Sequence, residues 1–207
     1  MNNPQEQAIN IVSRPIILSL YDWSMSWCKP YFENGYRVFP VDIKWGIDIL
    51  KWDYKMIPRH LVYGILAAPP CTDFAGSGAQ YWKEKDLDGR TEYSLSLVRK
   101  VLELVDHFQP TFWVMENPVG RLNKLLPELE KFGPWYFHPY EFGDPWTKKT
   151  GLWGIFNKPI KNIVEPIKYC EQCSYTQLLG GKSERTKELR SVTPSGFSYA
   201  FYEANKK

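Results

Sequence analysis

Two short stretches of the sequence carry side chains that could take part in covalent chemistry, and each ends an apolar run. Cys71 closes the stretch LAAPPC, and the two prolines before it fix the backbone, so that the thiol would project in a defined direction. A thiol becomes a good nucleophile when it is accessible and partly deprotonated. A single cysteine is more often buried and inert, so Cys71 taken alone favours a structural role.

Glu116 follows the apolar run TFWVM and is itself followed by Asn117 and Pro118. A carboxylate in such a run is costly to bury unless it is paired or protonated. A carboxylic acid that stays neutral can donate a hydrogen bond or a proton, which would make Glu116 a candidate acid. The alternative is a glutamate that caps a helix or stabilises a turn, and Asn117-Pro118 indicates a tight turn in either case.

The elements that would position these residues alternate between apolar runs and segments with helical spacing. Strands are predicted over residues 15–21, 36–41, 62–67, 111–115, 135–142 and 151–156, the last two as a hairpin. Helices are predicted over residues 23–34, 91–108 and 195–205. This order predicts an α/β fold with a mainly parallel, twisted sheet and helices on both faces. The carboxyl ends of its strands would share one edge, where such sheets bind ligands.

Length and composition narrow the class of protein. The 207 residues suit a single domain, 1–207, with residues 157–194 as a loop or small excursion. The formal charge of +3 neither demands nor excludes nucleic acid. We find no signal peptide and no stretch long enough for a membrane span, and the four cysteines are too few for a disulfide scaffold, so we expect a cytoplasmic protein. We expect no metal, because Cys170 and Cys173 form only half of a zinc site.

Four blocks of the sequence together resemble the cytosine-C5 DNA methyltransferases. LAAPPCTDFAGSG (66–78) and FWVMENPVGRL (112–122) resemble the Pro-Cys and Glu-Asn motifs of that family, in the same order and each after a strand. FGDPWTKKTGLWGIF (142–156) and GGKSERTKELRSVTPSGF (180–197) resemble its short, phage-type members. The resemblance covers residues 15–205 and implies a Rossmann-like class I methyltransferase fold.

The resemblance implies a mechanism in which Cys71 adds to C6 of cytosine while Glu116 holds or protonates N3. The activated C5 would then take a methyl group from S-adenosylmethionine, and a base would remove the C5 proton as Cys71 leaves. Pro70 and Asn117 belong to the same two motifs. The DNA would present a cytosine flipped out of a duplex or one already unpaired in a single strand.

On the cofactor side, the resemblance places S-adenosylmethionine against the ends of the first strands. The implied cofactor residues are Tyr21, Asp22, Ser24, Asp42, Ile43, Asp48, Ile49, Pro69, Ser191 and Thr193. An acid at a strand end, such as Asp42, commonly binds ribose hydroxyls. Trp23 and Met25 stand where the family often has glycines, which allow close backbone approach and positive φ. Either the pocket survives through altered contacts, or these side chains pack there and close it.

On the nucleic-acid side, the sequence departs from the family in two respects. Lys148 and Lys149 stand where the family has an arginine that contacts the base, and lysine could contact phosphates instead. Only about forty residues separate Lys149 from Arg190, which leaves no room for a large target-recognition domain. We therefore expect weak sequence specificity, a separate specificity partner, or a substrate other than duplex DNA. The candidate nucleic-acid residues are Lys148, Lys149, Lys182, Arg185, Lys187 and Arg190, with a solvated loop as the alternative.

Two other functions remain open from the sequence. A catalytically inactive relative that binds DNA or a protein partner would account for the altered glycine turn and the missing recognition domain. The same chemistry on a free pyrimidine nucleotide or on RNA would account for the missing domain alone.

Overall fold

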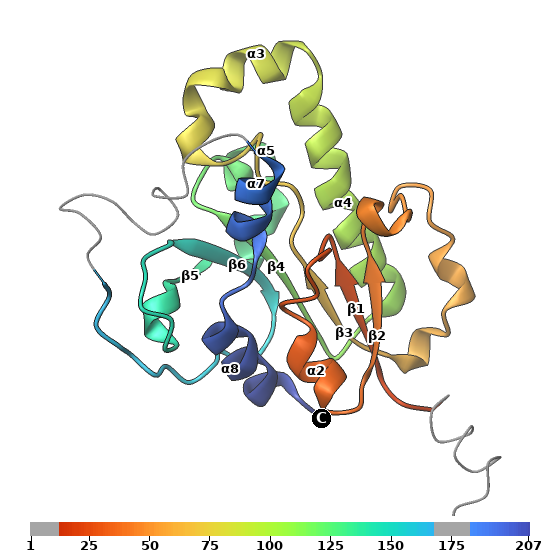
Figure 1. The fold of residues 1–207 in the computed structure, drawn as a ribbon. Helices are drawn as coiled ribbons and strands as arrows, with labels where there is room; N and C mark the ends of the chain where they lie inside the picture. The colour runs from red at the N-terminus through yellow and green to blue at the C-terminus, as the bar shows by residue number, and fades with distance from the viewer. Residues whose placement is uncertain (1–12, 168–182) are drawn as a thin grey trace, which may run out of the picture.

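Six strands form one sheet in the computed structural model, which describes residues 13–167 and 183–207 (Figure 1). The strands are β1 Ile16–Leu20, β2 Arg37–Val41, β3 Val62–Ala67, β4 Phe112–Pro118, β5 Trp135–Phe137 and β6 Thr150–Ile155. Their order across the sheet is β2-β1-β3-β4-β6-β5. The first four in this order are parallel to one another, whereas β6 is antiparallel to both β4 and β5. The prediction of a mainly parallel sheet is confirmed.

Helices cover both faces of this sheet. The long helix α4 (Arg90–Phe108) packs on one face, and α2 (Lys29–Glu33) and α8 (Ser195–Asn205) pack on the other (Figure 1). In the part of the chain that the structure describes, the other helices are α3 Trp82–Leu87, α5 Leu122–Leu125 and α7 Glu184–Ser191. Short 3-10 turns are η1 Ile43–Trp45, η2 Tyr54–Met56, η3 Arg59–Leu61, η4 Gly76–Tyr81, η5 Pro127–Phe132 and η6 Pro139–Glu141. Within the two described ranges, no helix is long and apolar enough to cross a membrane.

The side chains of β1 show why helices cover both faces of the sheet. Ile16, Leu18 and Leu20 are buried in the hydrophobic cluster that contains the apolar stripe of α4. Ile17 points to the opposite face and is buried in the cluster that contains Phe197 of α8. Successive side chains of a strand alternate between faces, so a strand covered on both sides needs a continuous apolar run. The run that predicted this strand is therefore explained by the two layers of helices.

The helix predicted over residues 23–34 is wrong in its first half. Residues 23–28 form turns, and Met25 lies there at φ 54°, in the left-handed region that a right-handed helix excludes. The helix begins only beside Pro30, whose fixed φ suits a first helical turn. Gly35, at φ 82°, follows the end of this helix as the sequence predicted.

Two further boundaries differ from the sequence predictions. The strand predicted over residues 135–142 stops two residues before Pro139, where the turn η6 begins. Residues 157–194, predicted as a loop or small excursion, include the helix α7 among their described residues. Its start is capped by the hydroxyl of Ser183, which accepts a hydrogen bond from the backbone nitrogen of Thr186 (3.2 Å).

Candidate active site

The Pro-Pro-Cys turn lies just beyond the carboxyl end of β3 and is fixed from two sides. The carbonyl oxygen of Cys71 accepts hydrogen bonds from the backbone nitrogens of Phe74 (3.0 Å) and Ala75 (2.9 Å). Asn117, which is fully buried on β4, donates from Nδ2 to the carbonyl oxygen of Pro69 (3.1 Å). Cys71 keeps part of its surface exposed. The turn therefore fixes Cys71 at the carboxyl edge of the sheet, with the residue partly exposed and its thiol largely buried.

The turn that follows β4 is joined directly to the turn that carries the thiol. The backbone nitrogen of Gly76 donates to the carbonyl oxygen of Val119 (2.9 Å), and that of Arg121 donates to the carbonyl oxygen of Phe74 (3.0 Å). Between these bonds lies Gly120, where a Cβ would come within 1.9 Å of the oxygen of Phe74. Only glycine fits such an approach, so the VGRL sequence after the Glu-Asn pair serves to bring the two turns together.

Three charged or ionisable groups interact at this point. Nζ of Lys148, just before β6, lies 3.9 Å from Oε1 of Glu116. Burial raises the pKa of the Cys71 thiol above its ordinary value, and the negative charge of Glu116 raises it further. Lys148 acts on the same thiol in the opposite direction. At neutral pH the thiol is therefore protonated, and the charges that surround it control how readily it ionises.

A cavity of about 450 Å³ opens beside this turn, at the carboxyl edge of β1, β2 and β3. Its size is that of a small-molecule site. It is lined by Tyr21, Asp22, Trp23, Ser24, Val41, Asp42, Ile43, Lys44, Ile47, Asp48, Ile49, Ala68, Pro70, Tyr93, Leu97, Glu188, Ser191 and Thr193. Nearly all of the residues predicted to hold the cofactor thus face one cavity. The exception is Pro69, whose neighbour Pro70 lines the cavity instead.

The turn after β1 has positive φ angles of the kind that glycine favours, although it contains no glycine. Tyr21 and Met25 lie in the left-handed region, at φ 61° and 54°. Asp22 closes the turn by accepting hydrogen bonds from the hydroxyls of Ser19 (3.0 Å) and Ser24 (2.9 Å). The cavity is present although the family's glycines are replaced, so the substituted side chains do not fill it.

Helix α7 forms a further wall of this cavity. Glu188 of α7 pairs with Lys44, which follows β2, at 2.8 Å. Just after the helix, the backbone nitrogen of Thr193 donates to the hydroxyl of Ser26 (2.9 Å). Sequence reasoning missed Lys44 and Glu188, as well as Leu97 of α4. No local pattern marks them, because their place at the cavity depends on contacts between distant segments.

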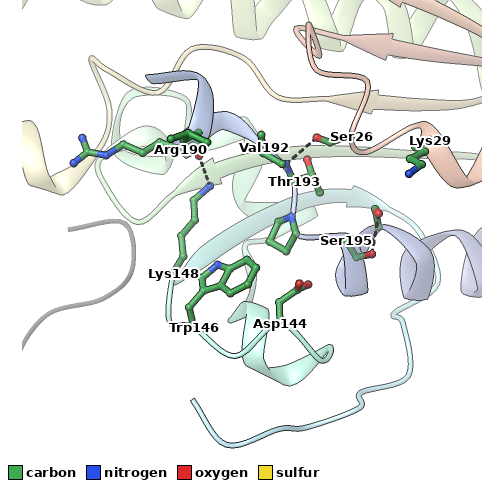
Figure 2. A pocket seen from close by; sticks show the side chains of 12 residues that line it. Ser26, Lys29, Asp144, Trp146, Lys148, Arg190, Val192, Thr193 and Ser195 are labelled. Carbon is green, nitrogen blue, oxygen red and sulfur yellow. Dashed lines mark hydrogen bonds between the residues drawn. The ribbon is translucent and has the colours of Figure 1, made fainter. Parts of the chain in front are cut away.

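The basic residues predicted to contact nucleic acid are only partly brought together. A second cavity of about 360 Å³ lies beside the segment that follows α7, and Lys148 and Arg190 both line it (Figure 2). Nζ of Lys148 donates there to the carbonyl oxygen of Arg190 (3.2 Å). Lys149 instead lies over the ring of Tyr136, at 4.7 Å, and Arg185 is exposed on α7.

Some predicted residues cannot be placed. Lys182, Cys170 and Cys173 lie outside the described residues, and so does the side chain of Lys187. Across residues 13–167 and 183–207, no group of three or more His, Cys, Asp or Glu side chains could hold a metal ion.

Comparisons with known proteins point to one family. No protein-family model matches the chain. A curated protein of Frog virus 3 (isolate Goorha), described as a "probable DNA (cytosine-5)-methyltransferase", is 28% identical over 150 residues, which are 66% of this chain and 69% of that protein. A solved structure from E. coli, described as a candidate DNA modification methyltransferase encoded within a prophage, matches with a TM-score of 0.50 at 15% identity. That match covers 74% of this chain and 52% of the other, so this chain spans about half of its length.

The solved structure, at this identity, bears on the fold alone, whereas the viral protein bears on the family. Together they confirm the Rossmann-like methyltransferase fold and the resemblance of this chain to the DNA cytosine-5 methyltransferases.

Proposed function

We propose that this protein transfers a methyl group from S-adenosylmethionine to C5 of cytosine in DNA through a covalent adduct with Cys71. One observation carries the proposal: a thiol on a partly exposed residue, a carboxylate and a small-molecule cavity meet at one edge of the sheet. The thiol and Glu116 lie on the ends of neighbouring strands and interact electrostatically. Pro70, adjacent to the thiol, lines the cavity.

The lining of the cavity fits a cofactor that contains adenosine. Asp42 and Asp48 bring carboxylates that can accept hydrogen bonds from ribose hydroxyls and from an amino group. Ile43, Ile49 and Leu97 bring apolar surface against which a flat base can pack. When bound, S-adenosylmethionine supplies an electrophilic methyl group.

The residues of the chain would then act in a fixed order. The thiol of Cys71 loses its proton and forms an Sγ–C6 bond, while the C5–C6 double bond of cytosine opens. The thiol proton passes to solvent, and Glu116, once it has taken up a proton from solvent, hydrogen-bonds to N3 and delivers that proton to the ring, which neutralises the charge brought by the thiolate. After C5 has taken the methyl group, a base removes the C5 proton, the double bond re-forms and the Sγ–C6 bond breaks. Lys148, which favours the thiolate, supports the first step.

DNA is the proposed substrate because the viral relative is described as a DNA methyltransferase. Lys148 lies at Glu116, so it can contact the phosphate or the base of a nucleotide whose cytosine enters the site. Because the roughly forty residues between Lys149 and Arg190 leave no room there for a large recognition domain, sequence selection would be weak or would come from a separate partner. The target base would be flipped out or already unpaired.

A methylation assay with matched cysteine variants tests the proposal. The purified protein is incubated with methyl-labelled S-adenosylmethionine and cytosine-containing DNA, and 5-methylcytosine is measured in the digested product. Cys71→Ala should abolish methylation. The control Cys28→Ala removes a thiol that is buried in the core, where its Sγ donates to the carbonyl oxygen of Met25, and should retain methylation if it folds. Methylation by Cys71→Ala at the wild-type rate would refute the mechanism.

Two further measurements separate the other candidate functions. Calorimetry with S-adenosylmethionine and with its demethylated product tests the cofactor site directly. If neither binds while DNA still does, the protein is an inactive, DNA-binding relative. If dCMP or an RNA oligonucleotide replaces DNA as the better methyl acceptor, the chemistry stands and the substrate class is wrong.

A further inference from the structure

The three residues that follow the candidate nucleophile have their carbonyl oxygens held by residues from elsewhere in the chain. The oxygen of Thr72 accepts a hydrogen bond from Nζ of Lys85 (2.6 Å). The oxygen of Asp73 accepts one from Nε of Arg121 (3.1 Å), and that of Phe74 accepts one from the backbone nitrogen of the same arginine. The turn over residues 71–74, the Cys71 turn, is thus attached to α3 by the side chain of Lys85. It is attached to the turn after β4 by Arg121.

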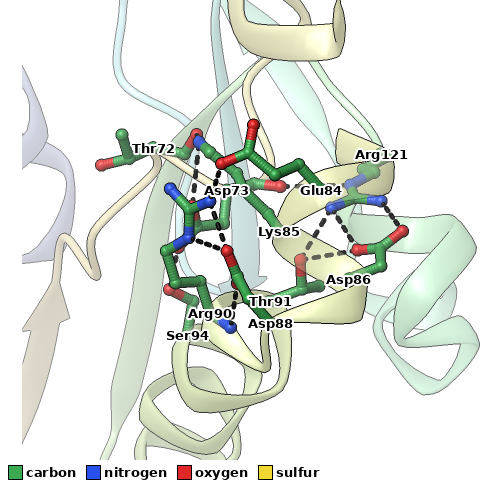
Figure 3. A network of polar contacts seen from close by, with 10 residues as sticks. All are labelled: Thr72, Asp73, Glu84, Lys85, Asp86, Asp88, Arg90, Thr91, Ser94 and Arg121. Carbon is green, nitrogen blue, oxygen red and sulfur yellow. Dashed lines mark hydrogen bonds and ion pairs between the residues drawn. The ribbon is translucent and has the colours of Figure 1, made fainter. Parts of the chain in front are cut away.

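Arg121 is itself fixed by a set of contacts to α3 and α4, in which its own side chain is buried and Asp86 is partly exposed (Figure 3). Nη1 and Nη2 donate to the two carboxylate oxygens of Asp86 (2.8 and 2.7 Å), and Nη2 also donates to the hydroxyl of Thr91 (2.9 Å). The guanidinium lies 4.8 Å over the ring of Trp82. Only 8% of the side chain of Arg121 is exposed. Such a two-pronged, stacked arrangement leaves the guanidinium a single orientation.

Lys85 is held in the same way. Its Nζ lies 2.9 Å from Oδ1 of Asp73, whose other oxygen accepts a hydrogen bond from the hydroxyl of Ser94 (2.5 Å). Burial alone would raise the pKa of Asp73, but the hydrogen bonds from Ser94 and Lys85 hold it below its ordinary value. The carboxylate therefore stays ionised at neutral pH, and Lys85 keeps its partner.

We propose that Lys85 and Arg121 are positioning residues that fix the Cys71 turn for attack on the substrate, an inference that rests on the proposed function. Neither residue lines the cofactor cavity. Each directs a buried cation at a backbone carbonyl oxygen one or two residues after the nucleophile. Buried ion pairs often add little to stability compared with apolar packing, whereas they can define a single geometry. A displacement of the reacting atoms by about 1 Å can lower a rate by about 10²-fold.

The test compares Arg121→Gln with Arg90→Gln. Arg90 belongs to the same cluster of charges, but it pairs with Asp88 and Glu84, is 47% exposed, and does not hold a carbonyl of the Cys71 turn. Arg121→Gln removes the bond to the Asp73 oxygen and the pair with Asp86. Asp86→Asn, a milder change at a partly exposed site, loosens Arg121 and serves if Arg121→Gln does not fold.

Two readouts are taken on every variant. The first is kcat, with KM for the cofactor and for DNA. The second is the alkylation rate of Cys71 by iodoacetamide as a function of pH, read by peptide mass spectrometry without cofactor or DNA. Cys28 is alkylated in the same sample and reports global unfolding, because it is fully buried in the core. The charges that act on the Cys71 thiol, namely those of Glu116, Lys148 and Asp73, are unchanged in these variants.

The proposal predicts opposite changes in the two readouts. Loosening the turn lets the thiol move into water, so Arg121→Gln should alkylate faster, with a midpoint at lower pH. Its kcat should fall by about 10²-fold while KM for the cofactor stays within about twofold. Arg90→Gln should match the wild type in both readouts. Arg121→Lys keeps the positive charge but loses the two-pronged guanidinium that binds both oxygens of Asp86. Its kcat should therefore lie between those of the wild type and Arg121→Gln.

Two results would overturn the proposal. The first is Arg121→Gln, or Asp86→Asn if Arg121→Gln does not fold, with wild-type kcat and wild-type alkylation of Cys71. The second is alkylation of Cys28 and Cys71 that rises in parallel, which would assign Arg121 to global stability. If the wild type shows no methylation but the alkylation of Cys71 alone changes as described, the proposed function fails and the positioning role stands.

Discussion

Replacing Asn117 by alanine tests how the Pro-Pro-Cys turn is attached to the sheet. Asn117 has no exposed surface, and its Nδ2 supplies the hydrogen bond to the carbonyl oxygen of Pro69. The substitution leaves that oxygen without its partner, which costs about 1–3 kcal/mol. For a chain of 207 residues this corresponds to a fall in Tm of about 2–12 °C. Because the bond lies two residues before Cys71, kcat should fall as well, by about 10-fold or more.

The assay pairs thermal unfolding, followed by circular dichroism, with kcat measured well below Tm. Asn123→Ala is the matched control. Asn123 lies on α5, where its Oδ1 accepts a hydrogen bond from Nε1 of Trp153 (2.7 Å) and its Nδ2 donates to the carbonyl oxygen of Gly133 (3.3 Å). This control should lower Tm and leave kcat near the wild-type value. An Asn117→Ala variant that loses stability but keeps full kcat would refute the claim that the bond to Pro69 positions the thiol.

Three further predictions concern the thiol, the turns and the cofactor. Glu116→Gln should lower the pKa of Cys71 and Lys148→Gln should raise it. The pH dependence of Cys71 alkylation should therefore shift in opposite directions in the two variants, and shifts in the same direction would contradict the electrostatic account. Gly120→Ala places a Cβ 1.9 Å from the carbonyl oxygen that faces it and should cost about 1–3 kcal/mol in denaturant unfolding, so an unchanged midpoint would show that the turns separate easily. Asp42→Asn should weaken S-adenosylmethionine binding in calorimetry by about 10-fold or more, and an unchanged affinity would remove Asp42 from the site.

The sequence predicted the elements whose signals are local. β3 and α8 match their predicted boundaries, residues 62–67 and 195–205, because an unbroken apolar run and a regular amphipathic segment each determine one structure. The strand ends that carry Asp42, Cys71 and Glu116 also fall at one edge, since parallel strands joined by crossovers leave no other arrangement.

The turn after β1 could not be predicted in the same way. Residues 23–28 contain no glycine or proline that would mark a break in a helix. Their path is set by Tyr21 and Met25 in left-handed conformations and by the hydrogen bonds of Asp22, all of which belong to the folded structure. Sequence similarity to glycine-containing turns identified the place, whereas the presence of the cavity is seen only in the folded structure.

The charge network around the Cys71 turn was also beyond sequence reasoning. The stretch KEKDLDGR, residues 83–90, looks like a solvated helix end, and Arg121 lies 35 residues from Asp86. Alternating charges of this kind are usually exposed. Lys85 and Arg121 are buried only because α3 and the turn after β4 both pack against the Cys71 turn, a contact that no local pattern encodes.

The central claim is that Cys71 forms a covalent bond to cytosine C6, and a trapped adduct tests it most directly. An oligonucleotide with fluorine in place of hydrogen at C5 of cytosine accepts the methyl group but has no C5 proton to lose, so the Sγ–C6 bond should persist. After incubation with S-adenosylmethionine, mass spectrometry of the digested complex should find the methylated nucleotide on the peptide that contains Cys71. No adduct, or an adduct that forms equally with Cys71→Ala, would contradict the account.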